Sequence, residues 1–455
     1  MGTGTRADAT PVPRRELPRR PIPRPISVPT TADAAPVPRR ELPRRPIPRP
    51  SSVPTTAGAA PDSGTAASPL EPLAEAVPTG PSLAFYLHVP FCVQRCHYCS
   101  FNTAPLEEPG LTARWVEAVR VEIGLLAGLP LNAARPALTS VFFGGGTPSL
   151  LDPDEVAAVL DALARGFRLA ADAEITLEAN PEGLTAARLA GYRAAGINRL
   201  SLGVQSLDDA LLAVLGRRHD AAGARAAFAA ARAAGFDNVS VDLMYGLPGL
   251  DPAGWRRTLD AVLDWGPDHL SAYGLTLEAG SRWGAGAAPA LPDEDTTVAQ
   301  YRAVCAAAAE RGFEHYEISN WARPGRRSRH NQTYWRRGEY LAAGPGACGF
   351  VGDLRWSDAR AFPRWRAALE RRRLPVETWE RLTPRQALAE TLILGLRTAD
   401  GVPARQLAER AADDPALARR LEIWRAQGLL VEAAGRVRLT EAGFLLSDAL
   451  FVALL

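Results

Sequence analysis

The chain has 455 residues, of which 47% are hydrophobic and 22% are charged, and its formal net charge is +2. This composition is typical of a globular protein, and no apolar run approaches the roughly 18 residues that a membrane-spanning helix needs. Residues 1–60 hold eleven arginines and four acidic residues, so the rest of the chain carries a net charge of −5. A mildly acidic folded part argues against a nucleic-acid-binding protein.

The first 80 residues differ in composition from all that follow. Residues 11–31 and 36–56 are nearly the same text, offset by 25 positions, and proline recurs every two or three positions within them. Such a segment cannot bury a core, so we expect a disordered tail over residues 1–80 with polyproline II character. It would act as a basic tether, as a ligand for proline-binding modules, or as a dispensable extension, and we favour the last.

From residue 81 to 290, apolar strand-like runs alternate with alanine-rich helical patterns. The strands are expected at 84–89, 140–143, 174–178, 199–204, 239–245 and 269–275, and the helices between them at 113–126, 154–164, 221–234 and 254–263. Repeated β-then-α units imply parallel strands with right-handed crossovers. The fold class is therefore α/β, a partial (β/α)6 barrel whose site lies at the carboxyl ends of the strands.

Residues 291–374 are read as a connecting region, and residues 375–455 as a separate domain. Helical patterns at 384–394, 404–410 and 416–426 precede two short strands at 429–433 and 436–439 and a last helix at 441–454. Helices followed by a small β-ribbon predict a winged-helix-like α+β domain.

Three of the five cysteines, Cys92, Cys96 and Cys99, fall within eight residues after the first strand. Their spacing lets one loop bring three thiolates to one iron–sulfur cluster, leaving one of four irons open. A structural zinc site prefers four closed ligands, and His97 has little freedom to be the fourth. Clustered thiols in an odd total, with no signal peptide, place the protein in a reducing compartment, the cytoplasm.

This motif in this position resembles the radical S-adenosylmethionine (SAM) superfamily. The resemblance implies a [4Fe–4S] cluster held by the three cysteines and SAM bound to its open iron. The glycine run Gly144–Gly146 resembles the segment that contacts the methionyl group of SAM, while Glu178, Gln205 and Asp242 lie on three successive strands. The SAM contacts that the resemblance implies are Tyr86, Tyr98, Gly145, Gly146, Thr147, Glu178, Gln205, Arg217, Asp242 and Gly274.

Within the superfamily the chain resembles the coproporphyrinogen dehydrogenase-like branch. The dehydrogenases carry a further cysteine where this chain has Phe101, and they have an arm that embraces the substrate. By contrast, Glu317–Ala322 and the string His330-Asn-Gln-Thr-Tyr-Trp335 resemble the signature of HemW-type haem chaperones, which bind haem and deliver it to membrane haemoproteins. The haem-ligand candidates are His330 and Cys348, the latter at a position where the family commonly has histidine.

The leading hypothesis is therefore a haem chaperone with a cluster and a SAM site, with haem and acceptor haemoproteins at a membrane surface as its partners. The alternatives are an oxygen-independent coproporphyrinogen III dehydrogenase of porphyrin biosynthesis, a related radical SAM methyltransferase, and a binding protein in which cluster and SAM only gate haem transfer. We expect no transmembrane segment and no nucleic-acid partner, and a homodimer is allowed.

Overall fold

The structure is a computed structural model that describes Leu73, Ala76 and residues 78–80, 82–133 and 136–455. The predicted repeat in the tail lies outside the described residues. The described residues before position 81 pack on the fold, because Leu73 and Ala76 are buried and the Thr79 amide donates to the Glu339 carboxylate at 2.9 Å. The packed part of the chain therefore begins before the predicted boundary at residue 81.

Six neighbouring parallel strands confirm the predicted β-then-α order. They are β1 (Ser82–Val89), β4 (Ala137–Gly145), β5 (Arg168–Ala179), β6 (Arg199–Gln205), β7 (Val239–Tyr245) and β8 (His269–Gly274). Their apolar side chains are nearly all buried, as expected for parallel strands covered by helices. The carboxyl ends of these six parallel strands therefore lie along the same side of the sheet, where their side chains can form one site.

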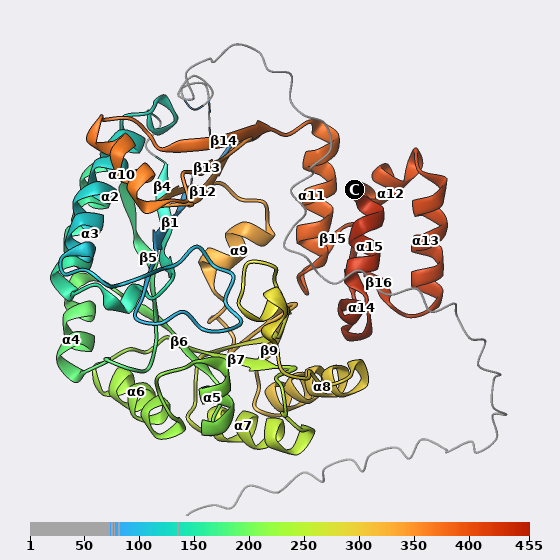
Figure 1. Cartoon of the computed structure of the whole chain (residues 1–455). Helices are drawn as coiled ribbons and strands as arrows, with labels where there is room; N and C mark the ends of the chain where they lie inside the picture. The colour runs from blue at the N-terminus through green and yellow to red at the C-terminus, as the bar shows by residue number, and fades with distance from the viewer. Residues whose placement is uncertain (1–72, 74–75, 77, 81, 134–135) are drawn as a thin grey trace, which may run out of the picture. The chain divides into compact units, whose positions relative to one another are not determined.

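Helices follow these strands along the chain, and most of them lie along the outer side of the sheet (Figure 1). They are α2 (Leu111–Ala127), α3 (Pro153–Gly166), α4 (Ala186–Ala195), α5 (Asp209–Leu215), α6 (Ala221–Ala233), α7 (Pro252–Asp264) and α8 (Glu294–Glu310). Helix α3 shows why such segments fold locally: Asp152 and Glu155 form a capping box around Pro153, and Val156, Val159 and Leu163 face the core.

The region predicted as a connection, 291–374, contributes to the same sheet instead. Beside β8 lie β10 (Asn320–Ala322) and β9 (Glu314–Glu317), and on the opposite edge β11 (Tyr340–Ala343) pairs in parallel with β1. Antiparallel strands β12 (Cys348–Val351), β13 (Leu354–Asp358) and β14 (Val376–Arg381) extend that edge to a sheet of 12 strands. Two helices, α9 (Arg329–Trp335) and α10 (Phe362–Glu370), complete the region.

The C-terminal unit begins later than predicted, because β14 belongs to the large sheet and the boundary falls after Arg381 rather than at residue 375. It consists of α11 (Pro384–Leu396), β15 (Val402–Pro403), α12 (Ala404–Ala412), α13 (Pro415–Ala426), β16 (Leu430–Ala433), β17 (Arg436–Leu439), α14 (Glu441–Leu445) and α15 (Ser447–Leu454). The last predicted helix is broken at Leu446, whose φ of −111° is not helical. No helix in the described part of the chain is long and apolar enough to cross a bilayer.

Candidate functional site

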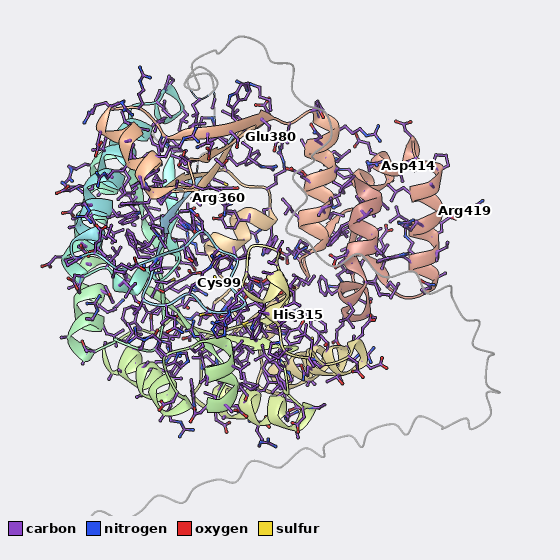
Figure 2. All side chains as sticks on the ribbon, viewed as in Figure 1. Cys99, His315, Arg360, Glu380, Asp414 and Arg419 are labelled. Carbon is purple, nitrogen blue, oxygen red and sulfur yellow. The ribbon has the colours of Figure 1, made fainter. Side chains whose placement is uncertain are left out.

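The three clustered cysteines lie on the loop that follows β1 and begins with the short strand β2 (Phe91–Cys92), paired with β3 (Ala104–Pro105). All three are free thiols and partly exposed, and each lies close enough to another to influence its ionisation electrostatically. Burial, with the neighbouring Cys99 and Cys96, raises the pKa of Cys92 to about 11, so a bound cation is needed to hold the thiolate form. Figure 2 labels Cys99 on this loop.

No set of three or more His, Cys, Asp or Glu side chains among the described residues converges on a point that suits one metal ion. A tetrahedral zinc site requires that convergence, whereas in an iron–sulfur cluster each thiolate binds a different iron. His97 is also engaged elsewhere: its Nδ1 lies 2.9 Å from the Val214 carbonyl oxygen and its Nε2 lies 3.2 Å from Arg282. His97 is therefore not placed to act as a fourth ligand beside the three thiols.

The predicted glycine loop packs directly behind the cysteine loop. A Cβ atom on Gly146 would lie 2.6 Å from the Phe91 carbonyl oxygen, and Gly145 has a φ of +114°, so both positions require glycine. The Gly145 amide donates to Glu178 at 3.2 Å, and the Thr147 hydroxyl donates to the Cys92 sulfur at 3.5 Å. The Gly146 amide donates to the Val89 carbonyl oxygen at 2.7 Å, so the glycine loop is held against both the cysteine loop and Glu178.

Arg217 joins the cysteine loop to the strand ends. Its guanidinium donates to the Cys96 sulfur at 3.6 Å, to Asn180 Oδ1 at 2.6 Å and to the Gly203 carbonyl oxygen at 2.7 Å. Thr147, Asn180 and Arg217, among others, line a shallow hollow beside Cys96, with about 350 Å³ of empty space, open solvent included. Asn180, which sequence reasoning missed, also donates to Thr147, and its sequence signal was only its position two residues after Glu178.

The remaining predicted contacts of the cofactor lie around the same strand ends. Gln205, the last residue of β6, has a φ of 65°, a strained conformation that non-glycine residues rarely adopt and that is common at functional sites. Gly274 ends β8 against the Tyr245 hydroxyl, and Tyr98 packs beside Trp283. Asp242 differs from the others, since it lies in the middle of β7 and therefore deeper between the strands.

A polar cavity lies inside the partial barrel, between the strands that carry these residues. It encloses about 530 Å³ of empty space, open solvent included, and Tyr86, Glu178, Asp242 and Tyr273 line it. Burial, with the nearby Asp242, raises the pKa of Glu178 to about 8, and burial raises that of Asp242 although Ser201 donates to its carboxylate at 2.9 Å. Glu178 is thus protonated at neutral pH and can donate a hydrogen bond to a ligand.

Helix α9, which carries the string beginning at His330, forms one wall of this cavity. The imidazole is 1% exposed, with Nδ1 3.0 Å from the Ser140 hydroxyl and Nε2 2.8 Å from the Tyr334 hydroxyl. Burial, with the charge of Arg199, lowers its pKa to about 3, so the ring is neutral. An iron could bind His330 only after one of these hydrogen bonds is broken.

Cys348, the second haem-ligand candidate, is the first residue of β12 and is exposed. It lies within electrostatic range of Tyr86 and Tyr334, which line the interior cavity together with His330. Cys305 and His315 are packing residues: Cys305 is buried in α8, and the His315 ring stacks on Trp321 with centroids 4.5 Å apart. Figure 2 labels His315 on the side of the sheet where it contacts Phe444 of the C-terminal unit.

Known proteins match this chain over almost all of its described part. The model of the radical SAM superfamily matches residues 86–262, and that of the HemN C-terminal domain matches residues 382–446, which begins just after β14. The heme chaperone HemW of Mycobacterium tuberculosis is 40% identical over 395 residues, covering 85% of this chain and 98% of that protein. The chain belongs to the HemW family.

Two further comparisons place the family. The mitochondrial radical S-adenosyl methionine domain-containing protein 1 of Bos taurus is 41% identical over 362 residues, covering 75% of this chain and 77% of that protein. Among solved structures, coproporphyrinogen III oxidase of Escherichia coli shares the fold, with a TM-score of 0.72, 23% identity, and coverage of 82% of this chain and 91% of that chain. HemW proteins and this oxidase therefore share one architecture.

A residue on the cysteine loop separates this HemW-family chain from the oxidase pattern. Phe101, at the position expected to be cysteine in the dehydrogenases, is 65% exposed. An exposed phenyl ring can neither bind iron nor transfer a proton. It offers apolar surface to a ligand or partner instead.

Proposed function

We propose that this protein is a haem chaperone that carries a [4Fe–4S] cluster on Cys92, Cys96 and Cys99 and binds SAM beside it. The near full-length match to heme chaperones carries the proposal. Phe101 in place of a further cysteine supports it, and so does the HemW-type signature, which forms a wall of the interior cavity. All five cysteines are free thiols, which suits a cytoplasmic protein.

The chain's own residues would divide the work between cluster and cofactor. The cluster, when bound together with SAM, supplies one-electron chemistry at the sulfonium. Arg217 would hold the carboxylate of SAM beside Cys96, because its fork already reaches both the sulfur and the strand ends. The protonated Glu178 and the strained Gln205 would position the rest of the cofactor over the cavity.

Of the two haem-ligand candidates, Cys348 is accessible and His330 is enclosed. We therefore propose Cys348 as the first contact with haem iron, since thiolate is a known axial ligand. His330 would then contribute only if α9 moved. Acceptor haemoproteins, a membrane surface and a homodimer remain part of the proposal, each to be tested by pull-down, vesicle binding and sedimentation with and without the cluster.

A second function, oxidative decarboxylation of coproporphyrinogen III, is favoured by the fold shared with the oxidase and by the polar cavity. One experiment separates the two functions. The protein is purified without oxygen, its cluster is reconstituted, and haem and coproporphyrinogen III are added separately with SAM and a reductant. Stable haem absorbance without porphyrin turnover supports the chaperone, whereas protoporphyrinogen in the chromatogram contradicts it.

A further inference from the structure

Arg199 is the first residue of β6, and its side chain enters the interior cavity. It is 2% exposed, its Nε is buried without a hydrogen-bond partner, and its guanidinium forms no hydrogen bond or ion pair with any residue that the structure describes. Two other arginines are held differently: the half-buried Arg217 donates three hydrogen bonds, and the buried Arg410 pairs with Asp414 at 3.1 Å. Arg199 is thus a buried cation beside the cavity whose N–H donors have no partner among the described residues.

The carboxyl groups around the cavity do not pair with this cation. Glu178 and Asp242 lie within electrostatic range of Arg199, but neither lies within the 4.0 Å of an ion pair. Glu178 accepts from the Gly145 amide, and Asp242 accepts from the Ser201 hydroxyl. A buried charge without a close counterion is costly, so the cavity favours an anion supplied from outside.

The two histidines that line the cavity with Arg199 are uncharged, so Arg199 is the positive charge of this region. Burial lowers the pKa values of His269 and His330, and both rings are occupied by hydroxyl groups, those of Ser240 and Tyr316 for His269. Asn331 lines the same cavity from α9, and its side-chain amide forms no hydrogen bond with any described residue. An amide and a guanidinium therefore supply free donors to one space.

The position of Arg199 separates it from the cofactor end of the cavity. It precedes Gln205 by six residues along a strand, which is roughly 20 Å at 3.3 Å per residue. The Gly203 carbonyl oxygen that accepts from Arg217 lies four residues along β6 from Arg199, roughly 13 Å at the same spacing, so a carboxylate held by Arg217 lies several residues along the strand from Arg199.

We propose that Arg199, with Asn331, binds a carboxylate of a ligand that enters the barrel interior. A guanidinium fork matches a carboxylate with two parallel hydrogen bonds, and among the described residues no other arginine lines this cavity. Two sources share this chemistry: a propionate of a tetrapyrrole, and the amino-acid carboxylate of a second SAM-like molecule. The tetrapyrrole source rests on the proposed function, whereas the carboxylate site does not.

The test compares acids with ligands that lack the carboxylate, using the full chain with its cluster reconstituted. Haem and its dimethyl ester are titrated by absorbance, and SAM and decarboxylated SAM by calorimetry. A charge-assisted pair inside the cavity predicts that the wild type binds the acid of the relevant pair about 10- to 100-fold more tightly. Arg199→Gln should remove that preference for haem, and for SAM it should remove the part that exceeds the preference set by Arg217 beside the cluster. It should leave the affinity for the ester, or for the decarboxylated ligand, unchanged, and Arg199→Lys should retain part of the preference.

Arg256→Gln serves as the matched control, because Arg256 is on the outer helix α7 and pairs with Asp260 and Glu310. A preference that Arg199→Gln abolishes for haem identifies propionate, and one that it lowers for SAM identifies the amino-acid carboxylate of a second SAM-like molecule even if haem does not bind at all. The proposal is overturned if Arg199→Gln keeps the full preference in both pairs, or if the wild type shows none in either. If Arg199→Gln does not fold, the proposal is tested by the wild-type comparison of haem with its ester and by the same titrations of Arg199→Lys.

Discussion

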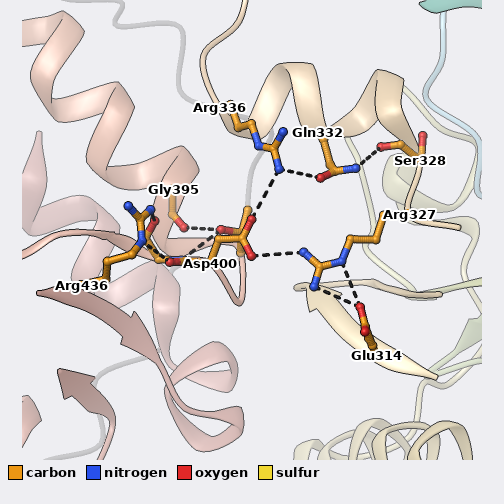
Figure 3. Close-up of polar contacts among 10 residues, drawn as sticks. Glu314, Arg327, Ser328, Gln332, Arg336, Gly395, Asp400 and Arg436 are labelled. Carbon is orange, nitrogen blue, oxygen red and sulfur yellow. Dashed lines mark hydrogen bonds and ion pairs between the residues drawn. The ribbon is translucent and has the colours of Figure 1, made fainter. Parts of the chain in front are cut away.

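The guanidinium of Arg397, at the end of α11, lies 5.2 Å from the centre of the Trp335 ring at the end of α9. The C-terminal unit thereby contacts the helix that forms a wall of the interior cavity. Asp400 adds a second link, because it pairs with Arg327 at 3.1 Å and with Arg336 at 3.6 Å, and its backbone carbonyl accepts from Arg436 (Figure 3). The C-terminal unit thus fixes the position of α9.

Loss of Asp400 should loosen α9 without unfolding the protein. Asp400→Ala removes partly exposed ion pairs, so we expect a stability loss of about 1 kcal/mol. Amide hydrogen exchange in residues 329–335 should become faster, as measured by mass spectrometry of the exchanged peptides. Glu432→Ala, which removes a surface pair with Arg425 in the same unit, should leave that exchange unchanged. Equal exchange in both variants would show that the pairs do not restrain α9.

The cluster should depend on three cysteines and on no others. We expect Cys92→Ala, Cys96→Ala and Cys99→Ala each to lose the 4Fe cluster, because each removes a thiolate that no other side chain replaces. Iron and sulfide content and the absorbance of the anaerobic protein measure this. The controls Cys305→Ala and Cys348→Ala change thiols outside the loop and should keep full iron content. Unchanged iron and sulfide in the three loop variants would refute the assignment.

The buried Glu178 should make stability depend on pH. Its pKa is about 8 in the folded state against an ordinary value of 4.5, so the folded protein holds a proton that the unfolded chain has released. The resulting stabilisation is complete below about pH 4.5 and is lost as the pH rises through 8, up to a few kcal/mol at about 1.4 kcal/mol per pKa unit.

Urea unfolding between pH 6 and pH 9 tests this dependence. The wild type should lose stability over this range, and Glu178→Gln, which keeps the neutral form, should lose less. Glu108→Gln is the control, since Glu108 is exposed and pairs only with Arg114. Parallel curves for wild type and Glu178→Gln would mean that the carboxyl is already ionised.

Removal of residues 1–72 should leave cluster, SAM and haem binding intact, because every residue placed in the site lies beyond them. Removal of residues 1–80 should cost stability as well, since it also deletes the buried Leu73 and Ala76 and the contact of Thr79 with Glu339. Thermal unfolding of the two truncated proteins and of the full chain gives the comparison. Loss of haem binding on removal of 1–72 would assign the tail a direct role.

The sequence was a good guide wherever a pattern was local. An apolar run such as the one around Phe85 indicates a buried strand within a few residues. A capping box such as Asp152–Glu155 indicates the start of a helix in the same way. The cysteine spacing and the triple glycine likewise singled out two loops that lie together, since the structure brings Thr147 to Cys92.

Features that depend on distant contacts were missed. β11 has only four residues, and its place beside β1 follows from pairs such as Phe85 with Leu341, which no local pattern encodes. Arg199 carried no signal, because one arginine at a strand start is inconspicuous in an arginine-rich chain. His330 was a haem candidate by chemistry, and only packing against Ser140 and Tyr334 shows that it is enclosed.

The pairing of β1 with β11 also has a consequence for synthesis. The ribosome makes β1 first, and its second neighbour is complete only when Ala343 has been added. At 5–20 residues per second, the strand leading into the cysteine loop remains a free edge for about 10 to 50 seconds. Exposed edges invite association with other strands. Aggregation of the nascent chain, rather than instability of the finished fold, is therefore the step at which production of this protein is most vulnerable.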